Sequence, residues 1–135
     1  MIIDLHLNGK LVLIVGAGNE ALKRIKLLEN EGCQIIVIGE KPNSEIIKLS
    51  KTKKIILKKI KLTSSLFLKK HKPFLVIAST TDLILNQKIV QTAKKMKILA
   101  YASDSPDSSD ISYLSLIDIK KIIKVAISTG GGSPI

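Results

Sequence analysis

Short apolar runs alternate along this chain with segments whose apolar residues recur at helical spacing. The apolar runs predict five strands, at Leu11–Val15, Cys33–Ile38, Ile55–Leu57, Phe74–Ala78 and Ile98–Ala102. Strands that are apolar throughout are typical of a parallel sheet covered on both faces by crossover helices. The pattern therefore predicts the α/β class, with helices on both faces of one parallel sheet.

Four helices are expected between these strands. In the first, Ala21, Ile25 and Leu28 fall on one face, and Gly32 supplies a left-handed stop. Pro42 and Ser44 precede the second helix, and Ser64 or Ser65 is expected to cap the third. The fourth helix is expected to begin at Thr81 or Asp82 and to run to about Met96. Each of the first four strands is thus followed by a helix.

The character of the sequence changes after the fifth strand. Ser103–Asp110 consists of Ser, Asp and Pro, so a surface loop is expected there. Ile111–Ile119 and Ile122–Ile127 are two β-rich runs, and a glycine-rich turn follows them. We therefore expect two regions: a sheet domain at 1–102, and a loop with a C-terminal β extension at 103–135.

The net charge of the chain favours anionic partners. There are 22 basic and 11 acidic residues, a formal charge of +11, and Arg24 is the single arginine among the lysines. Base-specific readers rely on arginine and single-strand binders on aromatic platforms, whereas the aromatic residues here are few and scattered. The composition argues against a nucleic-acid binder. The lysines are expected to form an ordinary solvated surface rather than a dedicated binding patch, and in either case their field favours a polycarboxylate substrate.

Neither a metal site nor a membrane segment is expected. Cys33 is the single cysteine, and with His6 and His71 it gives no spacing typical of zinc ligands. No apolar run reaches the roughly 18 residues of a bilayer span, and the first residues lack the pattern of a signal peptide. We therefore expect a cytoplasmic protein without a resident metal.

The segment Gly16–Ala21 has the pattern G-x-G-x-x-A, between a predicted strand and a predicted helix. Gly16 permits a tight turn, and Gly18 lets the backbone approach a pyrophosphate. The phosphates would rest on N–H groups at the helix start, where Asn19 and Glu20 are also expected on the cofactor. This context predicts a Rossmann-type dinucleotide-binding domain; the alternative is a glycine turn that serves strand–helix packing alone.

Two charged residues at the end of the second predicted strand bear on the choice of cofactor. Glu40 lies 22 residues beyond Gly18, where a carboxylate accepts hydrogen bonds from the adenosine ribose and repels a 2′-phosphate. The spacing predicts NAD rather than NADP. Lys41 beside it weakens that preference, because an ammonium group partly tolerates the extra phosphate.

Four segments together resemble precorrin-2 dehydrogenases, including the N-terminal part of bifunctional siroheme synthases. The first, Leu13–Ala21, resembles the opening of the family, and the second, Ala78–Asp82 with Asn86-Gln87, resembles the family's segment beside the cofactor. The third, Ser103–Pro106, resembles the family's V-D-x-P loop. The fourth, Ile127–Pro134, resembles its S-T-G-G-x-S-P segment. Each match is weak alone, but the four occur in the family's order across nearly the whole chain.

The resemblance implies NAD-dependent removal of two electrons and protons from precorrin-2 to give sirohydrochlorin, with the hydride going to the nicotinamide. It implies that Thr80 and Asp82 lie on the cofactor, and that Asp104, which matches the aspartate of the V-D-x-P loop, is the general base. Loss of a hydride from a ring carbon leaves a cation that must shed a proton, which agrees with a carboxylate in this role. Without the resemblance, the sequence alone favours the interpretation of Asp104 as an ordinary turn residue.

The resemblance further implies that Ser128, Thr129 and Gly130 line the tetrapyrrole site, with hydroxyl and N–H groups suited to carboxylates. The alternative for these residues is a plain strand end followed by a turn. A homodimer built partly through Ile111–Ile127 is also expected, because those apolar runs otherwise leave exposed strand edges.

Some features depart from the family. Tyr101 stands where the family usually has Asn, and Ile111 and Leu114 stand where Phe and Pro are common. Family members continue past the Ser-Pro segment into a helical module, whereas this sequence stops at Ile135, so ferrochelatase activity is not expected. The alternative function is a non-catalytic NAD(H)-sensing regulatory domain, which needs neither the Asp104 loop nor the Ser128–Pro134 segment.

Overall fold

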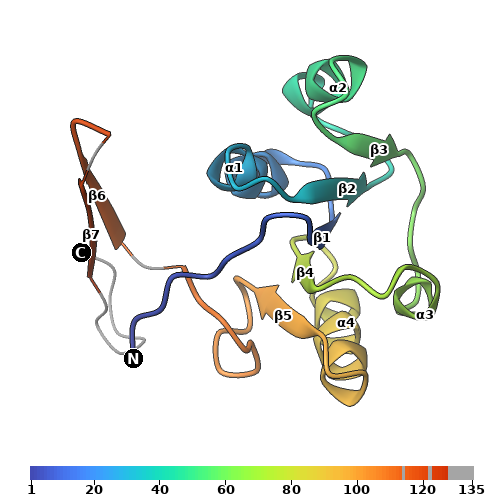
Figure 1. Ribbon diagram of the computed structural model, residues 1–135. Helices are drawn as coiled ribbons and strands as arrows, with labels where there is room; N and C mark the ends of the chain where they lie inside the picture. The colour runs from blue at the N-terminus through green and yellow to red at the C-terminus, as the bar shows by residue number, and fades with distance from the viewer. Residues whose placement is uncertain (114, 122, 128–135) are drawn as a thin grey trace.

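The chain forms a five-stranded parallel sheet with helices on both faces, followed by a separate two-stranded antiparallel sheet (Figure 1). This computed structural model describes residues 1–113, 115–121 and 123–127. The elements are β1 (Leu11–Val15), α1 (Asn19–Leu28), β2 (Gln34–Ile38), α2 (Ser44–Lys51), β3 (Ile56–Lys58), α3 (Phe67–His71), β4 (Leu75–Ala78), α4 (Leu83–Lys95), β5 (Leu99–Ala102), β6 (Ser115–Ile119) and β7 (Ile123–Ile127). The predicted α/β class and the C-terminal β extension are confirmed.

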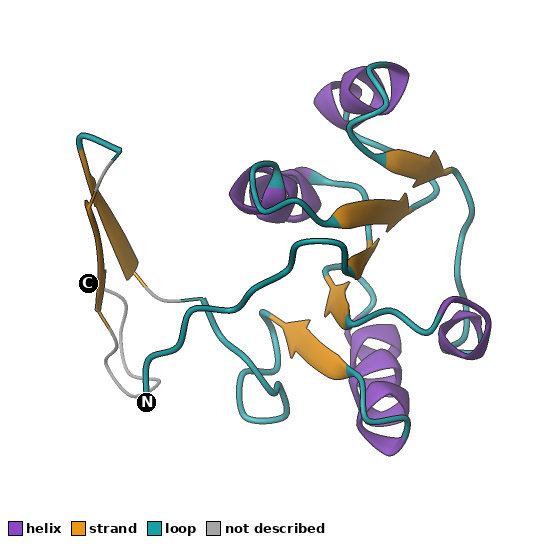
Figure 2. Cartoon of the chain, in the orientation of Figure 1, coloured by secondary structure: helices purple, strands orange, loops and turns teal. Residues whose placement is uncertain are grey.

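Alternating side chains of the five strands supply two apolar layers. The strand order is β3-β2-β1-β4-β5, with β1 at the centre. Val12 and Ile14 of β1 pack in the layer that contains Ala21 and Ile25 of α1, whereas Leu13 packs on the opposite side with residues of α3 and α4. Figure 2 shows these helices on the two sides of the sheet. Both faces of β1 are therefore buried, which explains why its sequence is apolar throughout.

The first strand has the predicted bounds, Leu11–Val15, and the other four lie within one residue of theirs. β2, β4 and β5 each start one residue late, so Cys33, Phe74 and Ile98 precede the ladder. β3 lies at Ile56–Lys58, where it pairs with Ile36–Ile38, rather than at 55–57. The reason is the same in each case. An apolar run shows which residues are buried, whereas the first residue of a strand is the first one that pairs with the backbone of a neighbouring strand.

The helix starts depend on local side-chain bonds. Asn43 caps α2 by accepting from the Glu45 N–H at 2.8 Å, so Ser44 is the first helical residue and not its cap. α3 starts later than predicted and has no side-chain cap, because the Ser65 hydroxyl bonds Thr92 on α4 instead. Asp82 caps α4, as predicted, through the Leu85 N–H at 3.1 Å. None of the helices in the described ranges is long and apolar enough to cross a membrane.

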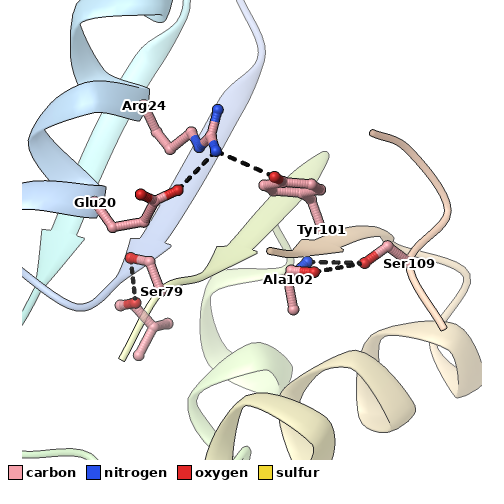
Figure 3. Close-up of polar contacts among 7 residues, drawn as sticks. Glu20, Arg24, Ser79, Tyr101, Ala102 and Ser109 are labelled. Atoms are coloured by element: carbon pink, nitrogen blue, oxygen red, sulfur yellow. Dashed lines mark hydrogen bonds and ion pairs between the residues drawn. The ribbon is translucent and has the colours of Figure 1, made fainter. Parts of the chain in front are cut away.

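The loop after β5 is attached to that strand. The Ser109 hydroxyl accepts from the N–H of Ala102 and donates to its carbonyl, as Figure 3 shows, and the Asp110 carboxylate accepts from the Ala100 N–H at 3.0 Å. These bonds occupy the free edge of β5. The first strand of the extension is shorter than predicted, because residues 111–113 have no regular secondary structure and β6 starts at Ser115.

Two glycines allow the turns at the carboxyl ends of β1 and β2 to approach their neighbours. Gly16 has φ +111°, and a Cβ built there would lie 2.7 Å from the Ser79 carbonyl oxygen. A Cβ at Gly39 would lie 2.5 Å from the Cβ of Ala17. Gly18, in contrast, has open space around it, so its lack of a side chain does not serve the packing of the chain itself.

We expect Gly16→Ala to destabilise the fold by at least about 2 kcal/mol, because the methyl group would meet fixed backbone at a φ that alanine rarely adopts. Gly18→Ala is the matched control, with a cost of at most about 1 kcal/mol expected, because alanine is a poorer N-cap than glycine but meets no clash at this position. Urea denaturation followed by circular dichroism measures both variants. Equal stability of the two would contradict this account of Gly16.

Candidate cofactor and catalytic site

A cleft of about 380 Å³ opens at the carboxyl ends of β1, β2 and β4, where the strand order reverses. Ligand sites of open α/β sheets are expected at such reversal points. The lining residues come from the turns after these strands and from the segment after β3: Val15, Gly16, Ala17, Gly18, Ile38, Gly39, Glu40, Lys41, Ile60, Lys61, Leu62, Ser79, Thr80, Thr81, Asp82 and Leu85. The structure thus brings together six of the eight residues predicted to bind the cofactor.

The start of α1 is suited to an anion. Its N-cap is Gly18, which offers no side-chain hydrogen bond to the first turn. The first N–H groups of a helix have no partner within the helix, so a ligand or water must satisfy them here. Open space around Gly18 permits a bulky ligand group to come close. The backbone therefore fits the pyrophosphate of a dinucleotide.

The other two predicted residues, Asn19 and Glu20, do not line the cleft. The Asn19 Oδ1 accepts from the Nδ2 of Asn43 at 2.8 Å, which links the starts of α1 and α2. The Glu20 Oε1 accepts from the Arg24 Nη2 at 2.6 Å. In this structure both side chains are engaged with the protein, so any contact with phosphate falls to their backbone N–H groups.

Arg24 is the centre of a buried polar cluster that the sequence reasoning missed. Its guanidinium donates to the Tyr101 hydroxyl at 3.1 Å and lies 4.3 Å from the ring centre of Tyr113. Figure 3 shows Arg24 reaching from α1 between Glu20 and Tyr101. Burial raises the pKa of Tyr101, while the adjacent guanidinium lowers it in part. The available signals were the i,i+4 spacing of Glu20 and Arg24 and the uniqueness of this arginine in the sequence.

Glu40 and Lys41 both line the cleft and are exposed. Lys61, from the segment after β3, lines it as well and adds a second cation that the sequence reasoning did not assign. Ile60 and Leu62 flank this lysine on the same segment and give the cleft an apolar side. One carboxylate and two ammonium groups thus border the end of the cleft near β2 and β3.

Thr80 and Asp82 lie at the end of the cleft near β4. The Asp82 side chain caps α4, which directs one of its oxygens to the Leu85 N–H. Thr80 is bound to Asn86 of α4: its hydroxyl and N–H donate to the Asn86 Oδ1 at 2.6 and 3.2 Å. Asn86 is fully buried, and its role was not predicted.

Asp104 lies in the turn after β5 and is exposed, outside the set of cleft-lining residues. Its Oδ1 accepts from the Asn86 Nδ2 at 3.4 Å, so the loop is linked through Asn86 to Thr80 of the cleft. Ser105 beside it is buried and accepts from the Nε2 of Gln87 at 3.4 Å. The loop is therefore not uniformly exposed, contrary to the expectation for Ser103–Asp110.

Ser128, Thr129 and Gly130, predicted to bind the substrate, lie outside the described residues. Within the described ranges, no group of three or more His, Cys, Asp or Glu side chains is arranged to hold a metal ion. The site as described therefore consists of the cleft, the start of α1 and the turn that carries Asp104.

Comparison with known proteins agrees with this geometry. The siroheme synthases of Nitrosococcus oceani and Neisseria meningitidis serogroup C are 29% identical over 133 residues and 30% identical over 132 residues. These matches cover 98% and 96% of this chain, but only 28% and 26% of the relatives. The solved structure of SirC, precorrin-2 dehydrogenase, has a TM-score of 0.82 and 26% identity over 99% of this chain and 64% of that protein.

A family model also matches most of the chain. It is described as "Putative NAD(P)-binding" and matches residues 3–115, which include the five-stranded sheet, the cleft and the Asp104 turn. On this match the chain belongs to that NAD(P)-binding family.

Proposed function

We propose that this chain catalyses the NAD-dependent dehydrogenation of precorrin-2 to sirohydrochlorin, a step of siroheme biosynthesis. The observation that carries the proposal is the connection of an exposed carboxylate, Asp104, to the wall of a dinucleotide cleft through Asn86 and Thr80. A pure nucleotide sensor has no need of such a connection. The similarity to SirC, precorrin-2 dehydrogenase, supports the same reaction.

The cleft fits NAD at three points. The uncapped start of α1 receives the pyrophosphate, the open space at Gly18 admits it, and the Glu40 carboxylate receives the adenosine ribose hydroxyls. Thr80 and Asp82 then border the other end of the dinucleotide. We propose NAD over NADP because Glu40 repels a 2′-phosphate, although Lys41 and Lys61 offset part of that repulsion.

The chemistry divides between the cofactor and the chain. NAD supplies the hydride acceptor when bound. Asp104 takes up the proton that the substrate carbon must lose after the hydride has left. Its exposure leaves room for a large substrate to approach from solvent. Ser128, Thr129 and Gly130 are proposed to bind the tetrapyrrole carboxylates, and the charge of +11 favours the approach of such an anion.

We also propose a homodimer formed through the region 103–135, in a cytoplasmic protein. The hairpin of β6 and β7 stands apart from the large sheet in Figure 1. A two-stranded sheet is marginally stable by itself, yet Leu116, Ile119 and Val125 expose 50, 44 and 39% of their surface. A second copy of the chain would cover these apolar side chains.

Replacement of Asp104 by Asn tests the proposed reaction. We expect the rate of sirohydrochlorin formation from precorrin-2 and NAD to fall by roughly a hundredfold or more, because Asn takes up no proton at neutral pH. The affinity for NAD should stay within a few-fold of that of the unmodified protein, because the Asn side chain has nearly the same shape as Asp. Anaerobic absorbance assays follow NADH and sirohydrochlorin together. Asp107→Asn, an exposed change in the same loop, is the control; the buried Ser105 is unsuitable for that purpose.

Normal turnover by Asp104→Asn would identify Asp104 as the wrong base. A wild-type protein that binds NAD without oxidising precorrin-2 would instead favour the sensing domain.

The cofactor preference depends on Glu40. We expect the unmodified protein to bind NADH more tightly than NADPH. Glu40→Ala should raise the affinity for NADPH by roughly tenfold, because it removes the repulsion between one exposed carboxylate and the 2′-phosphate. Titration of nucleotide fluorescence gives both affinities. Glu45→Ala is the control, because Glu45 pairs with Lys26 outside the cleft. Equal affinities for the two nucleotides before mutation would refute this role.

The dimer is tested by light scattering at high micromolar concentration, where we expect twice the mass of the 14.7 kDa chain. Val125→Lys should shift the mass toward the monomer, because it places a charge on the hairpin surface that we expect to be buried. Leu66→Lys, at an exposed apolar residue next to α3, should leave the dimer intact. A monomeric wild-type chain would rule out the dimer for residues 1–135.

A further inference from the structure

Asn86 stands out as a buried polar side chain between the cleft and the proposed base. It lies on α4, is 1% exposed, and all four of its side-chain hydrogen bonds go to Thr80 and Asp104. A buried amide that lost these partners would be costly, so the arrangement is specific. The dehydrogenation proposed above uses Asn86 as the link between Asp104 and the cleft wall, but it assigns this residue no part in the proton transfer.

The orientation of the Asn86 amide is fixed by the peptide groups of Thr80. The Thr80 N–H only donates, so it must face the amide oxygen, Oδ1, at 3.2 Å. The Thr80 carbonyl only accepts, so it must face the amide nitrogen, Nδ2, at 3.0 Å. A flipped amide would place like groups together at both contacts. The Nδ2 therefore always turns its second hydrogen toward Asp104.

This orientation has a consequence for Asp104. Its Oδ1 faces an N–H donor at 3.4 Å, the long end of the hydrogen-bond range. Such contacts at reactive groups often tighten when substrates bind. A hydrogen bond from the amide stabilises the negative charge on Oδ1 and makes that oxygen less basic than Oδ2. Within the described part of the chain, Oδ1 is the one oxygen of Asp104 with a hydrogen-bond partner.

We propose that Asn86 is a positioning residue: it holds Oδ1 of Asp104 as an acceptor and leaves Oδ2 as the atom that takes the substrate proton. The proposal rests on the proposed role of Asp104 as the base. Because Asn86 also holds both peptide groups of Thr80, it sets the carboxylate at a fixed place relative to the cleft wall. Proton removal and cofactor binding are thereby aligned by one side chain.

A double-mutant cycle tests whether Asn86 acts through Asp104. We expect Asn86→Ala to lower the rate of sirohydrochlorin formation roughly tenfold or more in the unmodified protein, and by at most about twofold in an Asp104→Asn background. Gln91→Ala, at an exposed residue of the same helix, is the control and should stay within about twofold of the unmodified rate. Equal losses from Asn86→Ala in both backgrounds would overturn the proposal.

A second measurement does not require turnover. In nitrogen-15 NMR spectra of the 135-residue chain, Asp104→Ala should move one of the two Asn86 amide proton resonances, the one facing the carboxylate, and leave the one facing the Thr80 carbonyl nearly unchanged. If neither resonance moves, Asn86 does not hold Asp104. If the protein proves unable to oxidise precorrin-2, the proposed reaction fails, and this spectrum alone decides whether the contact exists.

Discussion

The site depends on the close approach of the turn after β1 to the strands on both of its sides. The Gly16 N–H donates to the Ile38 carbonyl of β2 at 2.7 Å, and the Ser79 N–H donates to the Val15 carbonyl of β1 at 2.8 Å. The turn is thus held from both neighbouring strands. Since β2 and β4 lead to helices on opposite faces of the sheet, the chain diverges there and leaves the cleft open above Gly18.

Near the turn after β1, acidic and basic side chains offset one another, although the chain as a whole is positively charged. Glu20, in the first turn of α1, would by itself repel a phosphate at the same helix end. Its pairing with the buried Arg24 offsets that repulsion, while the aromatic rings of Tyr101 and Tyr113 keep the guanidinium in place. The lysines that give the chain its net charge contribute at longer range, with Lys41 and Lys61 at the border of the cleft itself.

The sequence predicted the sheet, the number and order of its helices, and most of the cleft, because these follow from local patterns: apolar runs, helical spacing and a glycine motif. It placed the starts of β2, β3, β4 and β5 one residue too early and did not predict the cap of α2, because both depend on which backbone groups a neighbour offers. It also missed the role of Arg24, and it placed Asn86 in the segment beside the cofactor without giving it a role. Their partners lie 77 and 18 residues away in Tyr101 and Asp104, and no local pattern encodes such pairings.

These two residues explain how the segment after β5 is held against the sheet domain. Arg24 reaches it from α1 on one face of the sheet through the ring of Tyr113, and Asn86 reaches it from α4 on the other through Asp104. A segment fixed from both layers does not behave as a free linker. We therefore expect no hinge at the boundary 102/103, which separates the cofactor cleft from the segment that the proposed function assigns to the substrate.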